Sequence, residues 1–305
     1  MDPDRRGHLT GRGVGLHPPV VVPTYVFVDD VQFPDLSQPG SLPTDKVFGF
    51  AGYVIDADGL AALLSALAAE KARIGLGEAD PVKHSQDPRM GRVYRRHYGA
   101  REGPDKFAIA TRNAFAISRV TLGHLTASGG RVLASISWPY SRTPARPELT
   151  RWAFENFLQR LGWLLRWEAR PHASVIVAFD RPDSDALYES FADAVHHGRT
   201  VEGAAYHSGP LAGLGVTPAL LFSSTPHSPP LQVADYVSRA CRDFLAWCHD
   251  GRRLPELFVP LIPALHRDAA GRIHGRGFAI KPESGFTVDD KVRELEAAAS
   301  SGGSS

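Results

Sequence analysis

Short apolar segments recur along this sequence, and they alternate with longer stretches in which apolar residues have helical spacing. Segments of this length that are rich in Val, Ile, Phe and Tyr are typical of buried strands. A Pro/Gly-rich turn, FPDLSQPGSLPTD, joins the first two and predicts a wide hairpin. The expected strands are residues 24–30, 46–55, 130–138, 173–180 and 216–222.

The longer stretches predict helices. In residues 56–75, Leu60, Leu63, Leu64 and Leu67 recur at the spacing of one helix face. An initial hairpin, followed by strands that alternate with helices, implies an α/β fold in which helices cover a mixed sheet. The other expected helices are residues 107–127, 149–167, 183–197 and 231–247, and residues 75–106 are expected to be irregular.

Composition limits the class of protein. The 305 residues are 43% hydrophobic and 22% charged, which is typical of a soluble globular protein. The 34 Lys and Arg residues nearly balance the 33 Asp and Glu residues, so overall charge neither supports nor excludes nucleic-acid binding. Cys241 and Cys248 form neither a disulfide framework nor a zinc pattern. With no apolar run near 18 residues, we expect a cytoplasmic protein that has no membrane partner.

Domain organisation follows from the same patterns. We expect a single domain over residues 20–285, with a helical insertion at about 75–127. Residues 1–19 are rich in Gly, Arg, Pro and His and are expected to form a flexible tail. Residues 286–305 are expected to hold the end of a helix and a flexible linker, AAASSGGSS.

Aspartates stand at three comparable places. Asp29 ends the first strand, Asp180 ends the fourth, and Asp235 lies in the otherwise apolar start of a helix. If the first and fourth strands are parallel neighbours, their carboxyl ends meet at one edge of the sheet. Carboxylates that converge there stay ionised only around a cation, and hard oxygen ligands favour Mg²⁺ or Mn²⁺. The alternative for each aspartate is a turn or helix-capping role.

The order of these segments resembles the domain of unknown function 3800 family, which belongs to the RNase H-like superfamily. The matching pieces are YVFVDDVQ, FGFAGYVI with its following helix, PVKHSQ, VIVAFD and LQVADYVSRA. The resemblance covers roughly residues 24–248. It implies an RNase H-like mixed sheet with flanking helices and a metal-dependent nuclease site.

The resemblance also implies roles for individual residues. Asp29, Asp180 and Asp235 match the family's acids, and Lys83 matches its lysine. The family strand ends in Asp-Glu-Ser-Gly, so Asp30 replaces the glutamate and is a further expected metal ligand. RNase H-like sites often have a glutamate on the helix after the third strand. Gln159 stands at that position here, and Glu155, one helical turn earlier, is the expected substitute.

A basic stretch, RMGRVYRRHYGAR, follows the lysine segment. Arginines supply phosphate contacts, and Tyr94 and Tyr98 could stack on unpaired bases. The alternative is a solvated helix face or a loop. The expected nucleic-acid contacts are Arg89, Arg92, Arg95 and Arg96.

Two functions follow. The first is a metal-dependent nuclease, a hydrolase that cleaves phosphodiester bonds of DNA or RNA with Mg²⁺ or Mn²⁺. The second is a catalytically weakened RNase H-like module that binds nucleic acid, or a protein or ribonucleoprotein partner, in a larger complex. The altered Asp29-Asp30-Val31-Gln32 motif and Gln159 favour the second.

Overall fold

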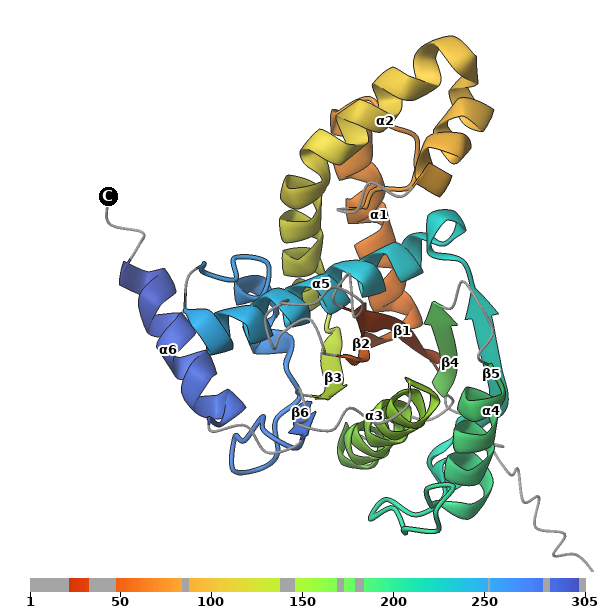
Figure 1. Ribbon diagram of the computed structural model, residues 1–305, viewed down its shortest axis with the longest axis vertical. Helices are drawn as coiled ribbons and strands as arrows, with labels where there is room; N and C mark the ends of the chain where they lie inside the picture. Colours follow the sequence, from red (N-terminus) through yellow and green to blue (C-terminus); the bar gives the residue numbers. More distant parts are fainter. Residues whose placement is uncertain are drawn as a thin grey trace, which may run out of the picture.

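One six-stranded mixed sheet organises the molecule, in the order β5-β4-β1-β2-β3-β6 (Figure 1). The computed structural model describes residues 22–32, 48–83, 88–137, 146–168, 173–178, 184–251, 253–281 and 286–301. The strands are β1 (Thr24–Gln32), β2 (Phe48–Asp56), β3 (Arg131–Ser137), β4 (Ala173–Ala178), β5 (Val216–Ser223) and β6 (Phe278–Lys281).

The direction of the strands defines the edge that matters for function. β1 pairs antiparallel with β2, which confirms the predicted hairpin. β1 pairs in parallel with β4, which is the condition under which the ends of the first and fourth expected strands meet, and β4 pairs in parallel with β5. The carboxyl ends of β1, β4 and β5 therefore share one edge of the sheet, which is where α/β proteins usually place a binding site.

Helices cover both faces of the sheet (Figure 1). α1, α2 and α5 pack on one face, and α3 and α4 pack on the other. Successive residues of β1 alternate between the two faces: Phe27 and Val31 join the α5 side, while Val26 and Val28 join the α3 side. Burial on both faces explains the continuous apolar run of this strand. The helices are α1 (Ala57–Arg73), α2 (Pro88–Ala127), α3 (Arg146–Glu168), α4 (Ser184–Ala192), α5 (Pro229–Asp250) and α6 (Val288–Ser301).

α2 is longer than the sequence predicts, and it extends beyond the sheet as a protruding arm (Figure 1). The expected irregular region is helical from Pro88 onward, and the chain turns at Gly99, whose φ of 78° is favourable for glycine. The two halves then pack together: the Tyr94 ring lies 5.8 Å from that of Phe107. A side chain at Gly103 would meet the backbone of Tyr94 and Arg95, so this position needs a glycine.

Other differences lie at the chain ends. β6 was not predicted, because four residues at the edge of a sheet carry little periodicity. α6 extends to Ser301, so the first five residues of the expected linker AAASSGGSS are helical instead. The expected tail, residues 1–19, lies outside the described residues. Among the helices that the structure describes, none has both the length and the apolar character needed to cross a membrane.

Candidate active site

Asp29 lies at the carboxyl-end edge of the sheet and faces α5. It pairs with Ala51, which belongs to the core on the α5 side, and its alternate neighbours Phe27 and Val31 belong to the same core. The residue is only 6% exposed. Its Oδ1 accepts a hydrogen bond of 2.9 Å from the Asp30 backbone N–H. Asp29 does not end the first strand as predicted, because β1 continues to Gln32, but its carboxyl group is enclosed by protein.

α5 brings Asp235 to this edge. The helix is anchored near its start by the Tyr53 hydroxyl, which donates to the Pro230 carbonyl at 3.0 Å. One turn beyond Asp235, the Ser238 hydroxyl donates to the Asp30 carbonyl at 2.7 Å. These two contacts fix both the position and the rotation of the helix over the end of β1.

Lys83 completes the site. Its Nζ lies 3.3 Å from Oδ1 of Asp235, and the two side chains are 11% and 24% exposed respectively. The segment before it is held from both sides of the backbone. Gln232 Oε1 accepts from the Val82 N–H at 3.3 Å, and the Tyr236 hydroxyl donates to the Val82 carbonyl at 2.9 Å.

The motif Gln232-Val233-Ala234-Asp235 at the start of α5 therefore has two functions. Gln232 and Tyr236 hold the backbone beside Lys83, while Asp235 pairs with the lysine itself. Gln232 Oε1 also accepts from Nζ of the buried Lys71 at 3.0 Å. Sequence reasoning did not identify Gln232, Tyr236 or Lys71 as parts of the site, although the LQVADY segment pointed to this helix.

Electrostatics shows that these groups act on one another. The pKa of Asp29 is raised well above its ordinary value, first by burial and then by the negative charges of Asp235 and Asp30. Lys83 opposes this increase. A buried carboxyl beside two other acids is destabilised as an anion, and a divalent cation relieves that cost. The donors are hard oxygens, so the residues present fit Mg²⁺ or Mn²⁺.

The third predicted acid, Asp180, lies outside the described residues. β4 is described as far as Ala178, two residues before it, and runs parallel to β1 with Val177 opposite Val28. Within the described ranges, no group of three or more His, Cys, Asp or Glu side chains is arranged to hold a metal ion. The predicted three-acid site therefore stays a prediction. Of its three acids the structure brings together Asp29 and Asp235, and it adds the predicted Asp30 and Lys83 to the same group.

Glu155 is not brought to this group. It lies on α3, which packs on the opposite face of the sheet from α5, and it is buried. Its Oε1 accepts a hydrogen bond of 2.8 Å from the Val201 N–H. Burial raises its pKa, and the other groups that act on it are Arg151, Ser190 and Glu202. These contacts secure the loop after α4.

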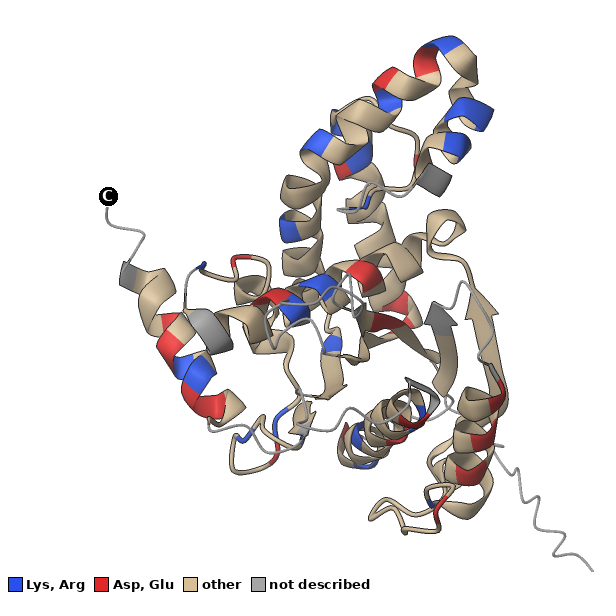
Figure 2. Cartoon of the chain, viewed as in Figure 1, with Lys and Arg blue, Asp and Glu red and all other residues tan. Residues whose placement is uncertain are grey.

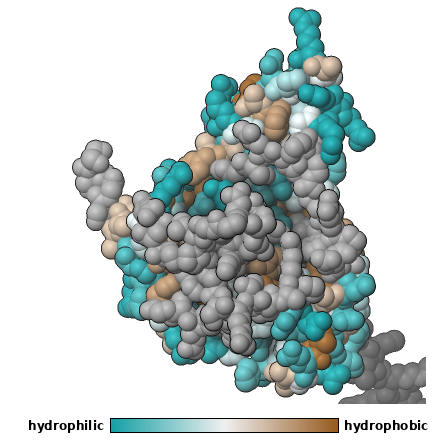
Figure 3. Space-filling view, in the orientation of Figure 1, coloured by the Kyte–Doolittle hydropathy of each residue, from teal (hydrophilic) through white to brown (hydrophobic). Residues whose placement is uncertain are grey.

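The basic segment forms the first half of α2 (Figure 2). Arg92, Arg95 and Arg96 are exposed there, and the outer part of the arm is largely hydrophilic (Figure 3). The Arg89 side chain lies outside what the structure describes.

The tyrosines of this segment do not fit the stacking interpretation. Tyr94 is fully buried, and its hydroxyl donates to the Pro81 carbonyl at 2.7 Å. Tyr98 stacks on Tyr94 and hydrogen-bonds to Asp80. Both rings hold the arm against the segment that leads to Lys83, so of the predicted contacts only arginines face solvent.

Comparison with known proteins found no matching family model, curated protein or solved structure.

Proposed function

We propose that this chain is a metal-dependent nuclease with an RNase H-like fold, acting on DNA or RNA. The observation that carries the proposal is the enclosed Asp29 carboxyl, whose pKa is raised by burial and by the adjacent Asp235 and Asp30. A cluster of buried acids lowers the stability of the folded chain, and a bound divalent cation would offset that repulsion.

Residues of this chain supply the rest of the chemistry. Asp29 and Asp235 would hold Mg²⁺ or Mn²⁺, with Asp180 and Asp30 as the other predicted ligands. When bound, such ions activate water and stabilise the charge that develops in phosphodiester hydrolysis. Lys83 is a fixed cation at the same site and would stabilise negative charge on the phosphate. Gln232 and Tyr236 keep Lys83 in place.

The test combines metal binding with cleavage. Mn²⁺ should raise the melting temperature of the wild-type chain by a few degrees, because the ion binds only the folded state. Asp29→Asn and Asp235→Asn should abolish this increase and reduce cleavage of DNA and RNA substrates by orders of magnitude. Asp243→Asn is a matched control, because Asp243 lies on the same helix and pairs with Arg239 at 2.9 Å. Equal effects of all three variants would contradict the proposal.

One observation favours the second function, a module that binds without cleaving. Asp235 is already paired with Lys83, so a cation is present without any metal. In that case Mn²⁺ would leave the melting temperature unchanged, and the chain would bind nucleic acid without cleaving it. The same two measurements therefore separate the two functions.

A further inference from the structure

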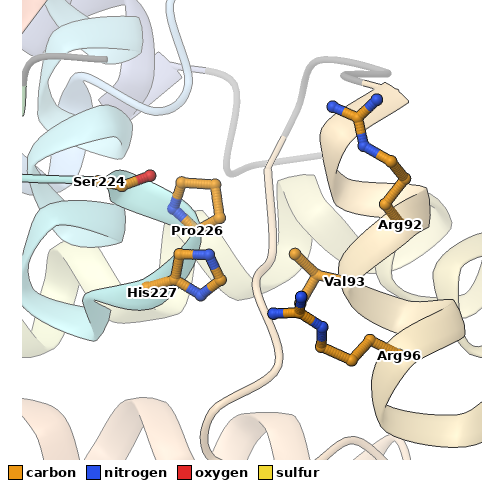
Figure 4. Close-up of a pocket in the computed structure, with 6 residues that line it drawn as sticks. All are labelled: Arg92, Val93, Arg96, Ser224, Pro226 and His227. Carbon is orange, nitrogen blue, oxygen red and sulfur yellow. The ribbon is translucent and has the colours of Figure 1, made fainter.

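A pocket of about 420 Å³ lies between the first half of α2 and the turn that follows β5 (Figure 4). One wall carries Arg92, Val93 and Arg96, and the facing wall carries Ser224, Pro226 and His227. In Figure 4 the Arg96 guanidinium extends toward the wall that carries His227. The sequence patterns predicted nucleic-acid contacts for the two arginines but assigned no role to the residues across the pocket.

The pocket is connected to the acidic site through both of its walls. Ser223 pairs with Ala178 of β4, so the turn after β5 leaves the same edge of the sheet that holds Asp29. The turn leads directly into α5, and Asp235 follows the first residue of that helix by six residues, about 9 Å of helix. On the other wall, α2 begins five residues after Lys83.

The lining has the chemistry of an anion site with an apolar side. Arg92 and Arg96 lie one turn apart on the same helix face, and among the described residues that line the pocket none is acidic. Guanidinium groups bind phosphate oxygens with paired hydrogen bonds. Ser224 offers a hydroxyl donor. Pro226 is buried, while the half-buried Val93 and the exposed His227 offer surface for a sugar or a base.

The size and shape of the pocket favour a single-stranded nucleic acid over a duplex. Pockets of about 300–1,000 Å³ hold small-molecule ligands, so this volume suits a single nucleotide. Protein walls stand on two sides, which suits a strand whose base is unpaired more than a duplex that exposes only its outer surface.

We propose that this pocket binds one nucleotide of a single-stranded nucleic acid beside the bond to be cleaved. Arg92 and Arg96 hold its phosphate, and Val93 and His227 contact its base or sugar. The role of this nucleotide in cleavage rests on the proposed nuclease function. Its binding does not, because the arginines need no metal to hold a phosphate.

The experiment measures binding of fluorescein-labelled oligo-dT and oligo-U by anisotropy, in EDTA so that no cleavage occurs. Arg96→Ala should weaken binding of the single strand by about tenfold, and His227→Ala by about threefold. Arg112→Ala is the matched control, because Arg112 is exposed on the same helix but does not line the pocket. It should change binding by less than about twofold. Unchanged melting temperatures would show that the variants fold.

The pocket would be overturned if Arg96→Ala and Arg112→Ala lost the same amount of single-strand affinity, or if a duplex bound as tightly as the single strand. It would also be overturned if a free mononucleotide competed with the labelled strand for Arg96→Ala but not for the wild-type chain. The two proposals fail separately. Loss of binding in Arg96→Ala without any wild-type cleavage keeps the pocket and removes the nuclease. Wild-type cleavage with unaltered binding in Arg96→Ala does the reverse.

Discussion

Nζ of Lys83 lies 3.3 Å from Oδ1 of Asp235, which joins the segment between α1 and α2 to α5, the helix that follows the edge strand β5. The pair is largely enclosed, and the same lysine opposes the raised pKa of Asp29. A single cation thus serves two carboxyl groups. Removing the Lys83 charge and displacing it should therefore have different consequences for metal binding and cleavage.

Lys83→Met should reduce cleavage while strengthening Mn²⁺ binding. The substitution removes the cation that competes with a metal ion for Asp235, so the Mn²⁺-dependent increase in melting temperature should become larger. Cleavage should fall by about ten- to a hundredfold, because the phosphate loses a fixed positive charge. A weaker Mn²⁺ effect in this variant would show that Lys83 supports the acids in another way.

Gln232→Met should loosen Lys83 without touching a charge. The substitution removes the side-chain acceptor of the Val82 N–H and one of the two acceptors of the Lys71 ammonium, which keeps its bond to the Glu78 carbonyl. This should cost about 1–3 kcal/mol of stability. Cleavage should fall more than in a destabilised control such as Tyr206→Phe, whose lost hydroxyl bonds the Glu155 carbonyl on the other face of the sheet. Equal cleavage in both variants at matched stability would assign Gln232 a purely structural role.

Lys71 predicts a pH dependence of stability. Burial lowers its pKa from 10.5 to about 8, so the folded chain releases this proton at a lower pH than the unfolded chain. Below about pH 8 both states are protonated, and folding bears the full cost of a buried ammonium. Between pH 8 and 10.5 the unfolded chain binds more protons, so stability rises with pH. Relative to Lys71→Met, the wild-type chain should gain about 3 kcal/mol over this range.

Chemical unfolding at several pH values measures this difference directly. Lys106→Met is a suitable control, because Lys106 also donates to a backbone carbonyl, that of Gly75, but near the surface. A wild-type stability that changes in parallel with that of Lys71→Met from pH 8 to 10.5 would contradict a buried, weakly basic Lys71.

The central strands could be predicted from sequence because burial on both faces leaves a continuous apolar run. β1 and β4 both show it, and their parallel pairing places the end of β1 beside the end of β4. Proximity of Asp29 to Asp235 was predictable for the same reason, since α5 follows a strand that ends at the same edge. The order of the elements carries this information without any knowledge of side-chain contacts.

The rest of the site depends on contacts between distant segments. The Gln232 bond to Val82 spans 150 residues, and no local pattern marks it. Glu155 was expected at the site from its helical position, but α3 packs on the face opposite α5. Tyr94 has the sequence context of an exposed aromatic residue, but the segment at Pro81 and the return of the chain after Gly99, which brings in Phe107, bury it.

The arginines of α2 give the last prediction, which concerns salt. Binding releases counterions from each phosphate that an arginine contacts, so fewer are released when contacts are lost. The triple variant Arg92→Ala, Arg95→Ala, Arg96→Ala should therefore bind single strands more weakly and with a flatter salt dependence. The slope of log K against log salt concentration should fall in magnitude by about 2, at roughly 0.7 per contact. The measurement is anisotropy of labelled oligo-dT across a KCl titration in EDTA. An Arg112→Ala, Arg119→Ala variant, with two exposed arginines removed from the second half of α2, should keep the wild-type slope. If the triple variant also keeps it, these arginines form a solvated helix face and the strand follows another path to Asp29.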